Sequence, residues 1–216
     1  MTEVNATFRG RLGLQNLTSE GSDATPSVSR LGDLVSQPAG KYYAAAKAGK
    51  VFHVTTLGAG VALNVDVEGV TASIVLRNPA NSGVDLVILE GRIARGTTGD
   101  VGPGAVFWIG MPTGESATLP TGTDLTTHNG YIGGGASRGV GLQAVTVPGT
   151  DPRRLRVLAN LSEELITSVT AHAAIFDQVD GAIVVPPGAW VGISGEGDAG
   201  AVPLLQASIT YAEVPI

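Results

Sequence analysis

The chain has 216 residues, a formal net charge of −6, 31 glycines, 12 prolines and no cysteine. This length allows one sizeable domain that buries about 70% of its unfolded surface, so packing rather than disulfides must stabilise it. Only 15% of the residues are charged, and the lack of a dense basic patch excludes a nucleic-acid partner. No apolar run approaches the roughly 20 residues of a membrane span, so we expect no membrane contact and synthesis in a cytoplasm.

The composition also indicates the fold class. Glycine, proline, valine and threonine are abundant, whereas the lysine and glutamate that cover exposed helix faces are few. We therefore expect an all-β protein with an aliphatic core. Its surface would be covered by threonine, serine, asparagine and glycine, and so low a surface charge is typical of a subunit that spends its life in an assembly.

The first segment in chain order, residues 1–26, is polar, follows no period and ends at Thr25-Pro26. We expect an extended N-terminal arm here, of a kind that can reach a neighbouring subunit. Residues 27–216 are then predicted to form a single β-sandwich domain.

Short runs of alternating apolar and polar residues predict strands along this domain. They cover residues 51–55, 61–67, 71–77, 84–95, 105–109, 142–147, 155–158, 182–185, 189–193 and 205–211. In the last run, 205–211, apolar and polar residues alternate without exception. In 84–95 the apolar phase changes after Ile88, which predicts a β-bulge or a crossing between two sheets.

Two segments are harder to assign. Residues 112–141 are rich in glycine and threonine and are expected to form a long surface loop, with a domain split there as the alternative. Residues 161–174 begin like a capped helix at Asn160, but their β-branched side chains favour a strand, and both readings stay open. Without any βαβ alternation, the fold predicted is an antiparallel β-sandwich of jelly-roll type.

One stretch resembles a catalytic motif. Residues 135–139 fit the Gly-x-Ser-x-Gly pattern, with Ser137 in the nucleophile position. That motif needs a strand before the serine and a helix after it, whereas here a glycine run precedes and a strand pattern follows. We therefore predict a loop, no catalytic residue and no enzyme.

Metal and cofactor sites are not expected either. The three histidines, His53, His128 and His172, stand far apart and show no metal-ligand spacing. Asp66 and Glu68 share a strand face that could bind calcium or act as an acid and a base, but nothing else supports such a site. We predict no metal and no cofactor.

Contact surfaces have clearer candidates. Arg153, Arg154 and Arg156 follow a turn and enter a strand, and arginine is favoured at interfaces. Trp108 and Trp190 are isolated aromatics, more typical of a core or a subunit contact than of a sugar-stacking platform.

Three stretches resemble virion structural proteins of tailed bacteriophages. They are TASIVLRNP at 71–79 with SG at 82–83 and LVI at 86–88, DGAIVVPPG at 180–188, and YAEVPI at 211–216. The resemblance implies a jelly-roll subunit, often trimeric, that decorates or cements a capsid from the outside or forms part of a tail fibre or spike. It carries no active-site residues.

We therefore expect a capsid decoration protein in the virion, a homo-oligomer and specifically a trimer, bound to the major capsid protein or another virion protein. The contacts expected with the capsid or between subunits are Phe8, Arg9 and Arg11 in the arm and Arg153, Arg154 and Arg156 on the body. The alternative is a tail component that recognises a receptor glycan, with Trp108, Trp190 or the loop 113–141 in an exposed groove. Head and tail locations are not separable by sequence.

Overall fold

The computed structural model describes residues 41–58, 60–62, 71–95, 104–111, 120–146, 152–161, 174–197 and 204–216. The predicted arm 1–26, most of the predicted strand 61–67 and most of the ambiguous segment 161–174 lie outside these ranges. One short helix, α1, covers Tyr43–Lys47. The strands are β1 Val51–Thr55, β2 Val61–Ala62, β3 Thr71–Arg77, β4 Val84–Arg95, β5 Gly104–Met111, β6 Thr121–Leu125, β7 Thr127–Asn129, β8 Val140–Thr146, β9 Arg153–Leu161, β10 Ile175–Val185, β11 Trp190–Gly197 and β12 Leu204–Pro215.

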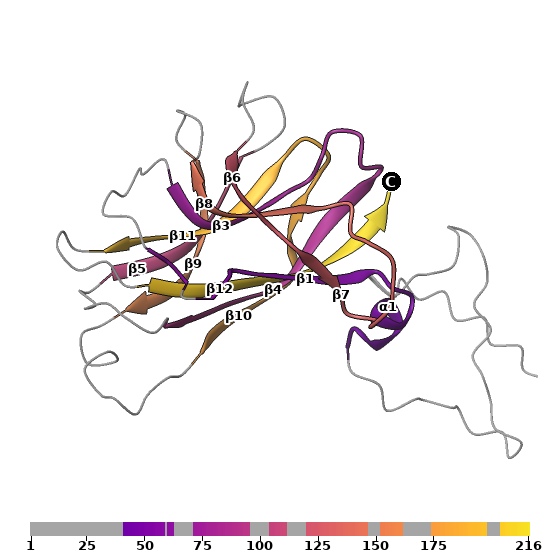
Figure 1. The fold of residues 1–216 in the computed structure, drawn as a ribbon, viewed down its shortest axis with the longest axis horizontal. Coiled ribbons are helices and arrows are strands. Elements are labelled where there is room, and N and C mark those ends of the chain that lie inside the picture. The colour runs from indigo at the N-terminus through magenta and orange to yellow at the C-terminus, as the bar shows by residue number, and fades with distance from the viewer. Residues whose placement is uncertain are drawn as a thin grey trace, which may run out of the picture.

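These strands form two antiparallel sheets packed as a sandwich (Figure 1). The first, the β4 sheet, has the order β10-β4-β12-β1-β7, and β2 also pairs with β12. The second, the β3 sheet, has the order β6-β8-β3-β11-β5-β9. From β3 to β5 and from β9 to β12, consecutive strands alternate between the sheets. The all-β sandwich predicted from the sequence is thus confirmed.

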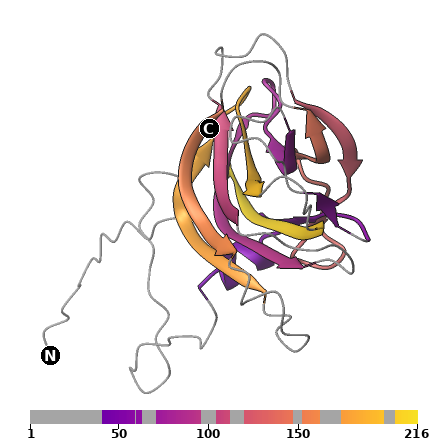
Figure 2. The same cartoon turned by 90° about the vertical axis from the view of Figure 1, so that its left-hand side faces the viewer.

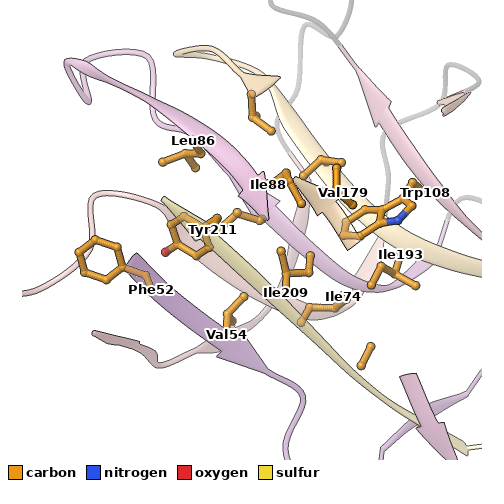
Figure 3. Packing of buried hydrophobic residues seen from close by; sticks show 14 of the residues in the cluster. Phe52, Val54, Ile74, Leu86, Ile88, Trp108, Val179, Ile193, Ile209 and Tyr211 are labelled. Carbon is orange, nitrogen blue, oxygen red and sulfur yellow. The ribbon is translucent and has the colours of Figure 1, made fainter. Parts of the chain in front are cut away.

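The main core lies between the two sheets. Ile209 and Ile88 of the β4 sheet face Ile74 and Ile193 of the β3 sheet, and all four are at most 1% exposed (Figure 3). This face of each sheet is built by every second residue of its strands, because side chains alternate across a pleated strand. The alternation of residues 205–211 therefore places Leu205, Ala207, Ile209 and Tyr211 inside, as the pattern predicted.

The phase change in β4 is a bulge. Thr210 of β12 pairs with Glu90 and Tyr211 pairs with Ile88, so Leu89 has no partner in β12 and turns to the outer face. The opposite neighbour, β10, is irregular at the same level, between Gln178 and Ile183. Of the two explanations predicted for the phase change, a bulge and a crossing between sheets, the structure shows the bulge, which returns Ile93 to the core.

A glycine beyond the bulge makes room for the largest core side chain. A Cβ atom on Gly91 would lie 2.2 Å from Cζ2 of Trp108, which is fully buried. The indole N–H of Trp108 donates a hydrogen bond of 2.9 Å to the carboxylate of Asp177, on β10. A bare backbone at residue 91 thus lets an aromatic residue of one sheet reach an acceptor on the other.

Two expectations need correction. The segment 112–141 is not a continuous loop, since it contains β6 and β7, whose threonine-rich residues carry little apolar alternation to reveal them. The helix α1 was not predicted, and at five residues it is too short to show a helical period. Within the described ranges no helix is long and apolar enough to cross a membrane.

Candidate functional site

The outer face of the β4 sheet carries the most varied group of polar side chains that the structure describes. Strand pairing aligns them in two rows across the sheet, which we call the polar rows. The first row contains Gln178, Glu90, Thr210, His53 and His128. The second contains Phe176, Arg92, Ser208 and Thr55. Because these residues come from five strands, only the sheet brings them together.

A third row on the same face is apolar and lies under α1. It contains Val184, Val87, Ala212 and Val51, aligned by the same strand pairings. Ala45 of α1 packs on this row together with Leu89, the bulged residue of β4. Figure 2 shows α1 against the outer side of the sheet, away from the other sheet. The helix thus covers Val51, Val87 and Ala212 of this row, while Val184 at its end stays exposed and the polar rows stay open.

The residues before α1 are fixed by Asp180. Its carboxylate accepts a hydrogen bond from the Tyr42 hydroxyl and forms a 2.5 Å ion pair with the Lys41 ammonium. The hydrogen bond from Lys41, followed by that from Tyr42, holds the pKa of Asp180 below its ordinary value. Asp180 has φ 52° and Gly181 has φ 85°, so the irregular part of β10 presents this carboxylate to the helix.

A hollow of about 600 Å³ lies where α1 meets the polar rows. Its lining comes from α1 and the residues before it, from β1, β4 and β12, and from Gly130. The polar members are Lys41, Tyr42, Tyr43, His53, Thr55, Glu90, Arg92, Ser208 and Thr210. This volume lies within the ~300–1,000 Å³ that small-molecule sites occupy.

The charged groups in the hollow are paired. The Arg92 guanidinium donates to the carboxylate of Glu90, whose side chain is only 17% exposed. His53 Nδ1 lies 3.0 Å from the Thr210 hydroxyl. Desolvation of the imidazole lowers the pKa of His53, and Arg92 and His128 act in the same direction against the opposing effect of Glu90. The ring is therefore held toward its neutral form, which both donates and accepts hydrogen bonds.

The pairing of His53 with His128 was not foreseen, because 75 positions separate them in the sequence and they meet only through the pairing of β1 with β7. Over the part of the chain that is described, no group of three His, Cys, Asp or Glu side chains is placed to hold a metal ion. The carboxylates Asp66 and Glu68 lie outside the described residues.

Ser137, the residue flagged by the hydrolase-like motif, lies in a hydrogen-bonded cluster. Its hydroxyl donates to Glu213 at 2.7 Å and lies 2.5 Å from the Tyr211 hydroxyl. The backbone N–H of Arg138 donates to the same Glu213 oxygen at 2.6 Å, and that of Gly139 donates to Ser137. None of the hydroxyl's partners in the described structure is a histidine. β8 follows, not the helix that the motif requires.

This cluster ties the loop 130–139 to the last strand. Glu213 is 7% exposed and Tyr211 is fully buried, and burial raises the pKa of the Tyr211 phenol. A buried carboxylate needs donors, and the loop supplies a hydroxyl and a backbone N–H. Glu213 carries no motif in the sequence, so its role was invisible before the fold was known.

The arginines predicted as contacts lie on β9, an edge strand of the β3 sheet. Arg156 forms a 2.8 Å ion pair with Asp177 of β10, the residue that also accepts from Trp108. The Arg154 guanidinium lies 4.6 Å from the centroid of the Phe107 ring. Arg153 is exposed at the start of the strand. Phe8, Arg9 and Arg11 lie outside the described residues.

The two tryptophans are core residues, as their isolation in the sequence predicted, and they do not form the exposed groove that the alternative tail hypothesis required of them. Trp108 is 0% exposed in the main core, and Trp190 is 3% exposed in a second apolar cluster. That cluster lies on the outer face of the β3 sheet, since its members Phe107 and Ile109 alternate with the core residues Val106 and Trp108.

Comparisons with known proteins identified no similar protein. No protein-family model, no curated protein and no solved structure matches this chain.

Proposed function

We propose that this protein is a non-catalytic structural subunit of a virion, a capsid decoration protein that associates with copies of itself and stabilises the shell from outside. One observation supports self-association above all: the two sheets meet along one side at adjoining edge strands that expose apolar side chains. We call the exposed apolar side chains of β9 and β10 the apolar margin. They are Leu155 and Val157 on β9 and Phe176 and Val184 on β10.

The margin is exposed to a degree that a monomer would avoid. Val157 is 65% exposed and Phe176 is 61% exposed. Each strand has one partner among the described strands, β5 for β9 and β4 for β10, so each presents an unpaired edge. Such an edge is a template for pairing with another chain, and monomers usually shield it with charge.

The arginines of β9 shield this margin poorly. Arg156 is turned to Asp177, and Arg154 lies on the Phe107 ring, so both are engaged within the chain. This supports a revised role for Arg154 and Arg156, in which they hold β9 in place. The neighbouring side chains of Leu155 and Val157 then make the contact with a second copy. Burial of apolar surface is the main favourable contribution to such an association.

The assignment to a virion rests on the resemblance of residues 71–79, 180–188 and 211–216 to phage structural proteins and on the low surface charge. A decoration protein acts by mass action, because each bound subunit stabilises only the assembled shell. We propose that the subunit is a trimer and that Phe8, Arg9 and Arg11 of the N-terminal arm contact the major capsid protein.

The first experiment measures molar mass by light scattering. The wild-type chain is expected to be a discrete oligomer, and Val157→Asp is expected to be monomeric because it places a charge in the contact. Ile132→Asp is the matched control, since Ile132 is 96% exposed but belongs to the loop before β8. The proposed contact is contradicted if the wild-type protein is a monomer, or if Val157→Asp has the same oligomeric mass as the wild type.

The second experiment tests the capsid. The oligomer is mixed with undecorated capsids of the parent phage and sedimented, together with a full-length variant that has alanine at positions 8, 9 and 11. Wild-type protein should sediment with the particles and the variant should remain in the supernatant as an intact oligomer. If the wild-type oligomer also stays in the supernatant, a tail location replaces the capsid proposal.

A further inference from the structure

The hollow beside α1 differs from the polar outer face of an ordinary antiparallel sheet. Such a face is normally flat and solvated. Here α1 and Gly130 raise walls around it, and the carboxylate of Glu90 is withdrawn from solvent to 17% exposure. A hollow lined by clustered donors and acceptors, with one carboxylate withdrawn from solvent, resembles a binding site more than a flat solvated surface.

The charges in the hollow indicate an uncharged ligand. Arg92 is paired with Glu90, and Lys41 is paired with Asp180. The formal charges of the two pairs cancel, so the hollow has no net charge to select an anionic or a cationic ligand. A neutral ligand with hydroxyl groups can instead add hydrogen bonds to both members of the pair.

The remaining lining gives such a ligand both polar and apolar contacts. Hydroxyl groups of Thr55, Ser208 and Thr210 line the hollow with the ion pair. His53 Nδ1 is engaged with the Thr210 hydroxyl, and the other ring nitrogen, Nε2, can serve a ligand as a donor or an acceptor. Tyr43 is 46% exposed at the rim, and Ala46 of the same helix also lines the hollow. An aromatic ring suits the C–H face of a sugar ring, and the polar rows suit its hydroxyls.

We propose that this hollow binds a neutral saccharide, so that the subunit also recognises a surface glycan. This is a binding role beyond the structural one. Figure 1 shows α1 at the end of the molecule opposite β9, whose Val157 tests the assembly contact, whereas Phe176 of the margin shares a row with Arg92 of the hollow. The site requires Tyr43 from the helix, Glu90 and Arg92 from β4, and Ser208 and Thr210 from β12.

The test is saturation-transfer NMR on the full-length protein with a panel of methyl glycosides. The panel contains neutral hexoses, 6-deoxyhexoses and N-acetylhexosamines, with glucuronic and sialic acid glycosides as charged probes. At least one neutral member is expected to bind with a Kd of about 1 mM, the range that a ligand of this size reaches. If no neutral member binds, or only charged members bind, the proposal is wrong.

Variants locate the binding. Tyr43→Ala and Arg92→Gln should each weaken it roughly tenfold, the factor expected for the loss of one good contact. Ser208→Phe, which fills the hollow without removing a charge, should abolish it. Tyr131→Ala is the control, because Tyr131 is an exposed tyrosine outside the hollow. Binding that survives Ser208→Phe in a folded protein would place the saccharide elsewhere and overturn the proposal. Light scattering on Tyr43→Ala should give the wild-type mass, which separates this result from the assembly test.

Discussion

The two faces of the β4 sheet use the same strands for different purposes. On the inner face, which every second residue of a strand reaches, side chains such as Ile88, Ile209 and Tyr211 are fully buried against the other sheet. On the outer face, the alternating residues form an apolar row under α1 and two polar rows that stay open. We infer from this difference that packing determines the inner face, and we predict that the polar rows contribute little to folding and are available for recognition.

The sharpest comparison uses neighbours in β12. Ile209→Ala removes a fully buried side chain from the core and should lower the free energy of unfolding by about 2–5 kcal/mol. Ser208→Ala, one position earlier on the outer face, should change it by no more than about 0.5 kcal/mol. Urea denaturation of both variants measures this, and similar losses would mean that the polar rows are structural.

A second comparison concerns the inner face beyond the bulge. Gly91→Ala would place a methyl group against the Trp108 ring and should cost about 1–3 kcal/mol through overpacking. The near-ultraviolet circular dichroism of Trp108 should change as well. Gly135→Ala is the control, because a Cβ there meets no atom within 4 Å. An unchanged stability for Gly91→Ala would show that the ring moves aside freely.

The hydrogen-bonded cluster at Ser137 should give an intermediate effect. Ser137→Ala removes a donor to the buried Glu213 carboxylate and should cost about 1.5 kcal/mol, with faster amide exchange in the loop 130–139. Thr146→Ala, at an exposed position of β8, serves as the control. Loop exchange rates equal to those of the wild type would argue against the role of this cluster.

The smallest expected effect is a pH dependence on the outer face. The pKa of His53 is lowered by folding, so the unfolded chain binds a proton more readily than the folded one. The stability contribution is therefore complete above about pH 6.5, the ordinary histidine pKa, and is lost as the pH falls below it. His53→Gln should flatten the profile of unfolding free energy between pH 5 and 7.

The comparison variant for this measurement is His128→Gln, which removes the neighbouring histidine while leaving Glu90 and Arg92 in place. His53→Gln should flatten the profile more than His128→Gln does. If the unfolding free energies of the wild type and His53→Gln vary with pH in the same way, folding does not lower the pKa of His53 as described.

The sequence by itself determined the fold class and much of the strand pattern. Period-two alternation is a local property that burial on one face imposes, so residues 205–211 and the bulge after Ile88 could be located without the structure. The same reasoning failed for β6 and β7, which are short and carry few apolar residues, and for α1, which is too short to show a helical period. The role of Ser137 as a partner of Glu213 was not predicted, because the two residues are far apart in the sequence.

Only the tertiary structure decided which distant residues meet. The polar rows join side chains from residues 53 to 210, and their alignment depends on strand order and register, which alternation alone leaves open. The same holds for Asp177, which joins Trp108 and Arg156 across the sandwich. Local pattern fixes which side of a strand a residue faces, whereas the pairing of strands far apart in the chain fixes its neighbours, and a site consists of neighbours.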